Sequence, residues 1–449
     1  MAQAFFGGVH PNDMKAATNE KAIEQLQAPA QVVIPMSMHF GAPCTPTVSK
    51  GDYVKLGQKI GEFKGLGAPI HASVSGTVAA VEPRPYSMGG KVMSVVIDND
   101  FKDELSEEVK APADPDALSV EEMVEMVKQA GIVGMGGATF PTHVKYAPQS
   151  SGRIIDTVIL NGIECEPFIT ADYRILIEHA DEVIRGLKYF LKASLANKGI
   201  IAIEDNKPRA IELFNQLTAD DPNISVVVCP EKYPQGSERH LIYAVTGRVV
   251  PERALPSAVG VIVDNVATAM QAALAVKDDL PCYERIVTVS GNAVHKPGNY
   301  RVRIGTLYSH LVEQGAQGLK NDPARIISGG PMMGFSLHSL DFPVLKGTAG
   351  LLLFDHQSEL AKLPPENPCV RCGKCVDTCP MFLEPTQLFK AVKHRDWPAA
   401  LAGHVGTCIE CGSCAYNCPA HIPLVQYIRM GKQFILTDGF GGHNPYYKK

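Results

Sequence analysis

The sequence predicts a multidomain chain that combines α/β and α+β domains. Three observations support this prediction: short strand-like segments separated by Gly and Pro near the N-terminus, a central alternation of apolar strand-like runs with helical patterns, and eight closely spaced cysteines near the C-terminus. We expect four units: the N-terminal segment with a β domain in residues 1–110, an α/β domain with a mainly parallel sheet in 117–281, a small mixed domain in 282–355, and a helical cysteine-rich domain in 356–440.

Length, charge and apolar content narrow the class of the protein. The 449 residues suffice for roughly three or four domains. The net charge of −5 comes from acidic and basic residues mixed along the chain, which excludes a strong electrostatic footprint for nucleic acid. The first residues, MAQAFFGGVHP, contain no charged region followed by an apolar one, so we expect no secretory signal and a cytoplasmic location. The longest apolar tract, 259–276, contains Asp264, Asn265 and Gln271 and is too polar to span a membrane.

The β domain is expected in residues 31–100, where QVVIPM, KGDYVKLGQKIGEF, PIHASVSGTVAAVEP and KVMSVVID are strand-like. The pairing of two of these segments resembles the barrel-sandwich fold of lipoyl and biotinyl carrier domains. A carrier needs a modified lysine at a hairpin tip, and Lys64 lies near that point, but its surroundings, EFKGLG, differ from both carrier motifs. We therefore favour an unmodified docking module over a swinging arm, and we interpret His71 as a packed or surface histidine.

The α/β domain follows a linker, APADPDALS. Ser119 and Glu122 form a capping box and predict the start of a helix. Strands are expected at DTVIL, GIIAIE, ISVVV and VGVIVD, and they alternate with helices near 175–192, 209–217, 237–245 and 267–276. Alternation of this kind predicts a mainly parallel sheet with helices on its faces.

After Cys282 the pattern becomes mixed, with RIVTVSGN, a Gly-Asn turn, YRVRIGTLYSHLVEQ and RIISGGP. A Pro-rich stretch, LPPENP, then leads into the cysteine region. The residues between the two groups of cysteines, EPTQLFKAVKHRDWPAALAGH, have a helical pattern. We expect helices to join two cysteine-bearing loops.

The cysteines form two quartets of the form C-x2-C-x2-C-x3-C-P, which is typical of two [4Fe-4S] clusters whose fourth ligands are exchanged. Structural zinc is the alternative, but zinc sites usually use C-x2-C pairs. The remaining cysteines, Cys44, Cys165, Cys229 and Cys282, are scattered, which favours a reducing compartment. The expected ligand sets are Cys369, Cys372, Cys375 and Cys418 for one cluster, and Cys408, Cys411, Cys414 and Cys379 for the other.

A glycine-rich loop, GIVGMGGATFPTHVKY, occupies residues 131–146. Consecutive glycines allow close backbone approach and can point several N–H groups at an anion. The loop follows a predicted helix and lacks the G-x-G-x-x-G spacing, so it fails the dinucleotide fingerprint. Its residues alone leave two interpretations open, a phosphate loop and a plain glycine-rich turn.

The glycine loop resembles the G-x-x-G-x-G-G-x-x-F-P-T-x-x-K element of the flavin-bearing NADH-dehydrogenase subunit of respiratory complex I. NGIECEP (161–167) resembles its N-x-x-E-x-E-P element, and YPQGSERHL (233–241) and DNVAT (264–268) are similar to two further segments in the same order. From FFGGVHP to the cysteines, the whole chain resembles the C subunits of Rnf-type ion-translocating ferredoxin:NAD oxidoreductases, which are electron transport complexes. The resemblance implies a β-grasp fold of the soluble-ligand-binding type for residues 282–355.

The resemblance also implies cofactor-binding residues. Departures from the complex I pattern are Thr139 and His143 in place of glycines, and Ile163 in place of an acidic residue, which is expected to remove one flavin hydrogen bond. NADH is expected to contact Phe140, Glu166 and Glu238. FMN is expected to contact Gly134, Gly136, Gly137, Lys145, Asn161, Glu164, Gly236, Asn265 and Thr268.

Flavin and clusters on one chain predict electron transfer from NAD(H) to FMN, to both clusters and to a partner, with no protein nucleophile or acid-base group. The resemblance implies a peripheral subunit on the cytoplasmic side of a membrane complex, with ferredoxin as ultimate electron partner and sodium-ion or proton transport elsewhere in the complex. Three alternatives remain: a cobalamin reductase of a bacterial microcompartment, an iron-sulfur relay without flavin or NADH activity, and an assembly scaffold with structural clusters.

Overall fold

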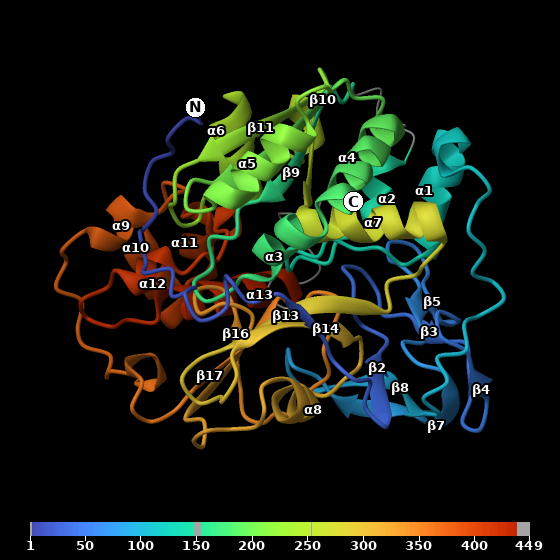
Figure 1. Cartoon of the computed structure of the whole chain (residues 1–449). Helices are drawn as coiled ribbons and strands as arrows, with labels where there is room; N and C mark the ends of the chain where they lie inside the picture. Colours follow the sequence, from blue (N-terminus) through green and yellow to red (C-terminus); the bar gives the residue numbers. More distant parts are fainter. Residues whose placement is uncertain (1, 148–153, 253, 438–449) are drawn as a thin grey trace.

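The computed structural model describes residues 2–147, 154–252 and 254–437, and Figure 1 shows their arrangement. Four sheets are present in this part of the chain: one of six strands, two of four strands and one of three strands. The order of units along the chain is the expected one, with β structure first, then α/β, then mixed structure, then short helices.

The barrel-sandwich unit contains a four-stranded sheet in the order β2-β8-β7-β4 and a three-stranded sheet in the order β3-β5-β6. Alternate side chains of its strands, among them Val32, Ile34 and Ile60, are buried between the two sheets. Lys64 lies in the loop between β5 and β6, and His71 is buried. The strands are β2 (Gln31–Pro35), β3 (Thr45–Pro46), β4 (Tyr53–Val54), β5 (Lys59–Glu62), β6 (Ile70–His71), β7 (Gly76–Pro85) and β8 (Lys91–Asn99).

The α/β unit is built on a parallel sheet in the order β11-β10-β9-β12. The chain proceeds from β9 to β10 and β11, then returns to place β12 on the other side of β9. The strand order therefore reverses beside β9, and crevices at such points are where open α/β sheets bind ligands. The strands are β9 (Thr157–Gly162), β10 (Lys198–Glu204), β11 (Ile224–Cys229) and β12 (Val261–Asn265).

Helices cover this sheet, and α1 begins with the expected capping box between Ser119 and Glu122. Where one helix was expected over 175–192, there are two, because the backbone of His179 leaves the helical region (φ −130°). The helices are α1 (Val120–Gln129), α2 (Thr142–Tyr146), α3 (Ala171–Glu178), α4 (Ala180–Ser194), α5 (Pro208–Leu217), α6 (Glu238–Thr246) and α7 (Val266–Asp278), with short 3₁₀ turns at η1 (Pro115–Ala117) and η2 (Pro256–Val259).

The mixed unit has a six-stranded sheet in the order β1-β14-β13-β17-β15-β16. Its edge strand β1 (Ile23–Gln25) comes from the N-terminal segment and pairs in parallel with β14. The sequence contained no signal for this pairing, because three residues are too few to show periodicity. The other elements are β13 (Glu284–Ser290), β14 (Gly298–Arg303), β15 (Arg325–Ser328), β16 (Phe335–Leu337), β17 (Gly350–Phe354), α8 (Tyr308–His310) and the π-helical turn η3 (Leu311–Gly315).

The cysteine-rich unit consists of short helices around two small apolar cores. Helix α10 packs against α13, which is the main helix contact in this unit. The expected helices between the two cysteine groups are present as α10 and α11. The elements are η4 (Glu359–Ala361), α9 (Lys374–Thr378), α10 (Pro385–Lys393), α11 (Trp397–Ala402), η5 (Val405–Thr407), α12 (Ser413–Tyr416) and α13 (Leu424–Thr437).

Residues 2–19, which we call the N-terminal strap, run without helix between the α/β and cysteine-rich units. Gly8 donates its N–H to the carbonyl oxygen of Thr378 at 2.8 Å, and Val9 exchanges backbone hydrogen bonds with Tyr233. Phe6 stacks on Phe382 with ring centroids 5.2 Å apart. The strap therefore contacts both units at once, as its course in Figure 1 also shows. No helix within 2–147, 154–252 or 254–437 is long and apolar enough to cross a bilayer.

Candidate cofactor sites

The crevice beside β9 brings together residues that lie far apart in the sequence. Asn161 and Asn265 are register partners at the carboxyl ends of β9 and β12. The Asn161 side chain donates to the carbonyl oxygen of Gly236 at 2.8 Å, which attaches the loop before α6 to the same edge. The pairing of β9 with β12 and the hydrogen bond of the Asn161 side chain thus bring Asn161, Asn265 and Gly236, three predicted flavin residues, together.

The glycine loop joins α1 to α2 and closes on itself across this crevice. The N–H of Gly134 donates to the carbonyl oxygen of Phe140 at 2.8 Å, and the N–H of Met135 donates to Thr268 Oγ1 at 2.9 Å, which fixes the loop to α7. A Cβ on Gly136 would lie 3.5 Å from the Asn265 side chain, and Gly137 has a φ of +107°, in the region that favours glycine. Gly136, Asn265 and Thr268, three of the predicted flavin residues, therefore meet at the start of α7.

The N–H groups of residues 136–138 have no hydrogen-bond partner among the described residues, and they lie in an open part of the loop. They are beside the N-terminus of α7, whose aligned peptide groups favour a negative charge. Unpaired N–H groups at a helix start are suited to a phosphate. Of the two interpretations of the loop, this geometry favours the phosphate loop.

Lys145 lies at the same edge but is paired within the protein. Its Nζ donates to the carbonyl oxygen of Val263 at 2.6 Å and to Asp264 Oδ1 at 2.8 Å. Asp264 also accepts from the hydroxyl of Tyr146, and burial raises the pKa of Tyr146, so this phenol stays protonated. The Lys145 side chain is 21% exposed.

Glu164 follows β9 and is held by backbone donors. Its carboxylate accepts from the N–H of Asp172 at 2.8 Å, near the start of α3, and Asp172 in turn accepts from the Asn265 amide at 2.6 Å. Burial raises the pKa of Glu164 to about 7, opposed by the charge of Lys15 3.8 Å away. This carboxyl is therefore easier to protonate than an exposed glutamate.

Lys15 of the strap is a site residue that the sequence did not single out. Its buried Nζ donates to the carbonyl oxygens of Glu164 (2.8 Å), Glu166 (3.0 Å) and Ile169. It therefore fixes the backbone of the loop NGIECEP from 149 or more residues away. In the sequence, Lys15 lies shortly after FFGGVHP. This segment has no periodicity or spacing that would predict the contact of Lys15 with the loop NGIECEP.

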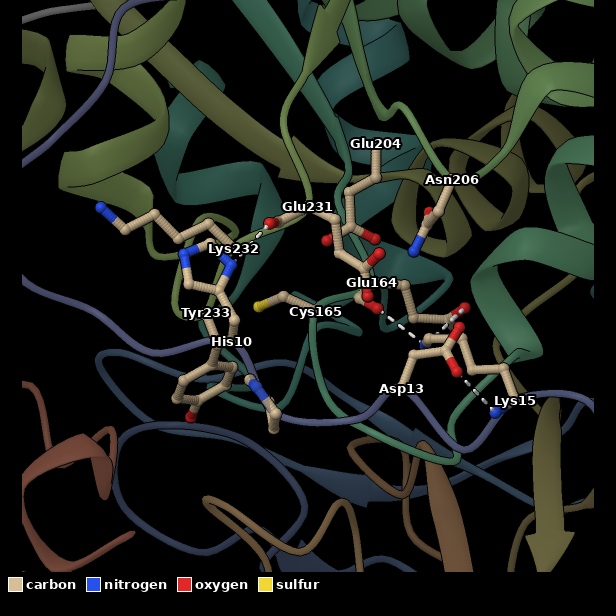
Figure 2. Close-up of a pocket in the computed structure, with 11 residues that line it drawn as sticks. His10, Asp13, Lys15, Glu164, Cys165, Glu204, Asn206, Glu231, Lys232 and Tyr233 are labelled. Carbon is tan, nitrogen blue, oxygen red and sulfur yellow. Dashed lines mark hydrogen bonds and ion pairs between the residues drawn. The ribbon is translucent and has the colours of Figure 1, made fainter. Parts of the chain in front are cut away.

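Beneath this loop lies a polar cavity of about 200 Å³ at the carboxyl ends of β9, β10 and β11. Figure 2 shows side chains from the strap and from the loops after these strands around it. Glu204 is fully buried and its Oε1 has no partner within the described structure, while its Oε2 is paired with Lys207. The lining residues are His10, Pro11, Asp13, Lys15, Glu164, Cys165, Glu204, Asn206, Glu231, Lys232 and Tyr233.

The three residues expected to face NADH lie in different settings. Phe140 is part of the glycine loop, with its ring centroid 5.9 Å from that of Phe40. Glu166 accepts from the N–H groups of Met332 and Met333, at 3.0 and 2.8 Å, so its carboxylate faces the turn after β15. Glu238 is the first residue of α6, within reach of the charges of Lys145 and Asp264.

The first cysteine set surrounds a cavity of about 370 Å³. Cys369, Cys372, Cys375 and Cys418 all line it, so the last cysteine of the second quartet lies with the first three of the first quartet. Burial raises the pKa of Cys375, and the neighbouring thiols Cys418 and Cys369 raise it further. Cys369 and Cys372 are exposed, so this site lies at the surface.

The second cysteine set is more buried. Burial raises the pKa of Cys414, and Cys408, Cys411 and Cys379 raise it further, so the last cysteine of the first quartet lies with the second quartet. The hydroxyl of Tyr233 donates to the carbonyl oxygen of Cys411 at 2.8 Å. Because Tyr233 also lines the polar cavity, this cysteine site adjoins that cavity, which the predicted flavin residue Glu164 lines as well.

The residues at the glycine loop fit FMN, and the two cysteine sets fit [4Fe-4S] clusters. Unpaired N–H groups, an open space at Gly137 and the fully buried Gln235, whose amide has no partner in the described residues, suit a bound polar cofactor. Within the described ranges no three His, Cys, Asp or Glu side chains lie close enough to hold one metal ion. Four thiols spread around a cavity suit a cubane better than a single zinc ion.

Comparisons with known proteins agree with this organisation. Four family models match, in chain order: an RnfC barrel sandwich hybrid domain over residues 3–102, a Nuo51 FMN-binding domain over 127–274, an SLBB domain over 286–336 and a 4Fe-4S dicluster domain over 367–422. The expected fold class and the expected cofactor types, FMN and [4Fe-4S], are thereby confirmed.

Relatives match over nearly the full chain. The C subunit of the Na⁺-translocating ferredoxin:NAD⁺ oxidoreductase complex of Acetobacterium woodii is 44% identical over 96% of this chain and 97% of its own length. This chain belongs to the C-subunit family of ion-translocating ferredoxin:NAD⁺ oxidoreductase complexes. Two more members of the family match it. The C subunit of the proton-translocating complex of Clostridium ljungdahlii is 44% identical (86% of this chain, 84% of its own), and that of the ion-translocating complex of Salmonella gallinarum is 41% identical (95% and 63%).

A solved structure shares the fold of this family member. An NAD⁺-reducing [NiFe]-hydrogenase in the H₂-reduced state superposes with a TM-score of 0.50 at 20% identity, covering 74% of this chain and 68% of that chain. At this identity the likeness shows a common fold and nothing about residues.

Proposed function

We propose that this chain is the NAD(H)-oxidising or NAD⁺-reducing subunit of a membrane ferredoxin:NAD oxidoreductase that is coupled to sodium-ion or proton transport. As part of that complex it is an oxidoreductase of the translocase class, and it carries electrons between NAD(H) and partner subunits. When bound, FMN would supply the exchange between hydride chemistry and the single-electron chemistry of the two [4Fe-4S] clusters.

One observation carries this proposal: the polar cavity that the predicted flavin residue Glu164 lines is also lined by Tyr233, which is bonded to the second cysteine site. Tyr233 follows β11, and its hydroxyl donates to the carbonyl oxygen of Cys411. A flavin and a cluster must lie close together for electrons to pass between them. Adjacent sites in one chain support a continuous route rather than two unrelated cofactors.

In this proposal the residues of the chain bind the cofactors and orient them. The free N–H groups of residues 136–138 and the start of α7 would receive the FMN phosphate. Asn161, Asn265 and Thr268 hold the loops that form the crevice. The full proposed set for FMN is Gly134, Gly136, Gly137, Lys145, Asn161, Glu164, Gly236, Asn265 and Thr268, with Phe140, Glu166 and Glu238 toward NADH. In this set Lys145 acts through Asp264, to which it is bonded.

The cysteines hold the clusters in exchanged sets. Cys369, Cys372 and Cys375 with Cys418 form the exposed site, and Cys408, Cys411 and Cys414 with Cys379 form the buried site. The buried site adjoins the polar cavity that Glu164 lines, and the exposed site can be reached by a partner. We therefore order the route as flavin, buried cluster, exposed cluster, partner.

The partners are other subunits of the complex, with ferredoxin as the ultimate electron partner. The described residues contain no membrane-spanning helix, so we propose that the chain binds to the cytoplasmic side of the membrane through its partner subunits.

An anaerobic NADH titration of the protein reconstituted with FMN, iron and sulfide tests the proposal. Flavin absorbance reports the first step, and electron paramagnetic resonance reports the clusters. Flavin bleaching followed by reduced-cluster signals supports the proposed route. Bound flavin that NADH cannot reduce would favour a relay fed from elsewhere, and failure to bind flavin would exclude the dehydrogenase activity.

A further inference from the structure

The two cysteine quartets share one local structure, and we call their C-x2-C-x2-C segments the first and the second loop. Arg371 and Glu410 occupy equivalent positions, two residues after the first cysteine of each loop, and have φ values of +56° and +58°. Gly373 and Gly412, two residues further on, have φ values of +79° and +78°. Because the backbones match, the two loops present equivalent faces, and the faces differ in what packs against them.

The face of the second loop is covered by other units of this chain. Ile409 packs against an apolar cluster that includes Tyr233 of the α/β unit. A Cβ on Gly412 would lie 2.7 Å from the carbonyl oxygen of Met332, so the mixed unit closely approaches the backbone of this loop. An apolar contact and a close backbone contact therefore join the buried cysteine site to its neighbours.

The equivalent face of the first loop is open. Val370, at the position equivalent to Ile409, is 66% exposed, and Cys372 is exposed where Cys411 is buried. A Cβ on Gly373 would have no atom of the described residues within 4 Å. We call the following residues the open face: Val370, Arg371, Cys372 and Gly373.

The charged residues of the two faces have opposite signs. Glu410 is paired inside the chain, with Arg429 Nε at 2.8 Å and Lys432 Nζ at 2.6 Å from its carboxylate. Arg371 is exposed, and its guanidinium has no ion pair among the described residues. An unpaired guanidinium beside an uncovered apolar side chain suits a surface that offers a carboxylate and an apolar group.

We propose that the open face is the docking site of an electron-carrying protein whose surface offers a carboxylate to Arg371, an apolar group to Val370 and close backbone approach at Gly373. The occupant is an electron carrier because whatever covers this face also covers Cys372, a predicted ligand of the exposed cluster. The second loop shows that an apolar and a backbone contact can join such a face to another unit. The inference rests on the proposed function and adds the chemistry of the partner's surface.

The test is photo-crosslinking in the intact complex. The photoreactive amino acid p-benzoylphenylalanine is incorporated in place of Val370, the complex is irradiated, and mass spectrometry identifies the crosslinked peptide. We expect a segment rich in Asp or Glu from a subunit that carries a flavin or an iron-sulfur cluster. A crosslink to a subunit without a redox cofactor, to lipid or to a second copy of this chain would overturn the inference, as would no crosslink in an active complex.

Charge variants test the role of Arg371 through the yield of this crosslink, which does not depend on the potential of the cluster. Arg371→Glu should lower the yield about fivefold at low ionic strength, because it places a carboxylate opposite the carboxylate of the partner, whereas Arg371→Lys should retain most of the yield. Arg395→Glu is the matched control, because Arg395 is also exposed in the cysteine-rich unit but does not line the first cysteine cavity. Equal yields for the two glutamate variants, at equal iron content, would contradict the proposal.

Reduction of the flavin and the clusters by NADH is measured separately, in the isolated full-length chain. Failure of that reduction in the wild type would count against the proposed function. A crosslink to an acidic redox subunit that depends on Arg371 would still support the docking site.

Discussion

Buried charges around the loop NGIECEP make its stability depend on pH. Lys15 supplies three hydrogen bonds to backbone carbonyls of residues 164–169, and burial lowers the pKa of Lys15. Glu166 is held by the N–H groups of Met332 and Met333. These contacts join the strap, the α/β unit and the mixed unit through single side chains.

The buried carboxyl of Glu166 predicts that the stability of the fold depends on pH. Burial raises its pKa to about 7, against an ordinary value of 4.5, even though two N–H donors lower it. The folded protein therefore holds a proton that the unfolded chain releases between these values, and the resulting stabilisation is complete below pH 4.5 and lost as pH rises through 7. We expect the stability of the wild type relative to Glu166→Gln to fall as pH rises from about 5 to 8, by about 3 kcal/mol at most.

Differential scanning fluorimetry across this range measures the effect. Glu164 contributes with the same sign and remains in the variant, so the slope should become shallower rather than vanish. Glu313→Gln, at an exposed position on η3, is the control. Parallel pH profiles for Glu166→Gln and the wild type would contradict this prediction.

The predicted FMN and cluster residues lie mostly at the ends of helices, and these helix ends position their side chains. Helix α7 begins at the crevice, with Asn265 as its N-cap and Thr268 in its first turn bonded to the glycine loop. The cysteine loops are followed by the single-turn helices α9 and α12, each of which begins after a glycine with positive φ. Helix starts thus bring the predicted residues of both sites into position.

Asn265→Ala should weaken FMN binding. Its amide oxygen accepts from the N–H of Ala267 and its amide nitrogen donates to Asp172, so the change removes a cap and releases a buried carboxylate. We expect a loss of about 1 kcal/mol in stability and about tenfold in FMN affinity, measured by fluorescence titration.

Ser119→Ala provides the matched control for this variant. Ser119 caps α1 at the end away from the glycine loop, so it should cost a similar amount of stability without affecting FMN. Equal FMN affinities in the two variants would show that the cap has no part in the site.

The exchange of fourth ligands can be tested with a double variant. If Cys369 and Cys418 bind the same cluster, Cys369→Ser with Cys418→Ser removes one cluster and leaves about four of eight irons per chain. If the ligands are not exchanged, the same variant damages both clusters. Iron content and electron paramagnetic resonance distinguish the outcomes, and Cys229→Ser, a buried cysteine of the α/β unit, should leave all iron in place.

In the whole molecule, the strap joins the loop after β11 to the buried cysteine site, because it bonds to Tyr233 and to Thr378. Gly8 has a φ of +80°, and a Cβ on it would lie 2.6 Å from the carbonyl oxygen of Tyr233. Its N–H meanwhile holds Thr378, next to Cys379. The strap therefore has no room for a side chain at the point where it joins the two units.

Gly8→Ala should separate the two units slightly and slow the reduction of the clusters by NADH, while flavin bleaching continues at the wild-type rate. Gly51→Ala is the control, because Gly51 also has a positive φ, +95°, but has no atom within 4 Å of the added Cβ. Both variants should lose roughly 1 to 3 kcal/mol from backbone strain. Stopped-flow absorbance resolves the two steps, and equal cluster reduction rates in the two variants would argue against the role of the strap.

The sequence predicted most features that depend on neighbouring residues, although it missed the break at His179 between α3 and α4. The cysteine spacing predicted the two clusters and the alternation of strands and helices predicted the parallel sheet, whereas FMN was implied by the family resemblance. The family models confirm the fold class and both cofactor types. The individual ligand residues remain predictions, although the structure brings Cys418 to the first cysteine set and Asn265 beside Asn161.

Contacts across long sequence separations came only from tertiary structure. Strand β1 joins a sheet whose next strand begins at residue 298, Lys15 reaches the loop after β9, Phe40 meets Phe140, and Tyr233 meets Cys411. No periodicity or spacing encodes such pairs, because each depends on how separately folded units pack and on which buried polar groups need partners. The clusters could therefore be predicted from a local motif and FMN from the family resemblance, whereas the relative positions of the cofactor sites were decided by packing between the units.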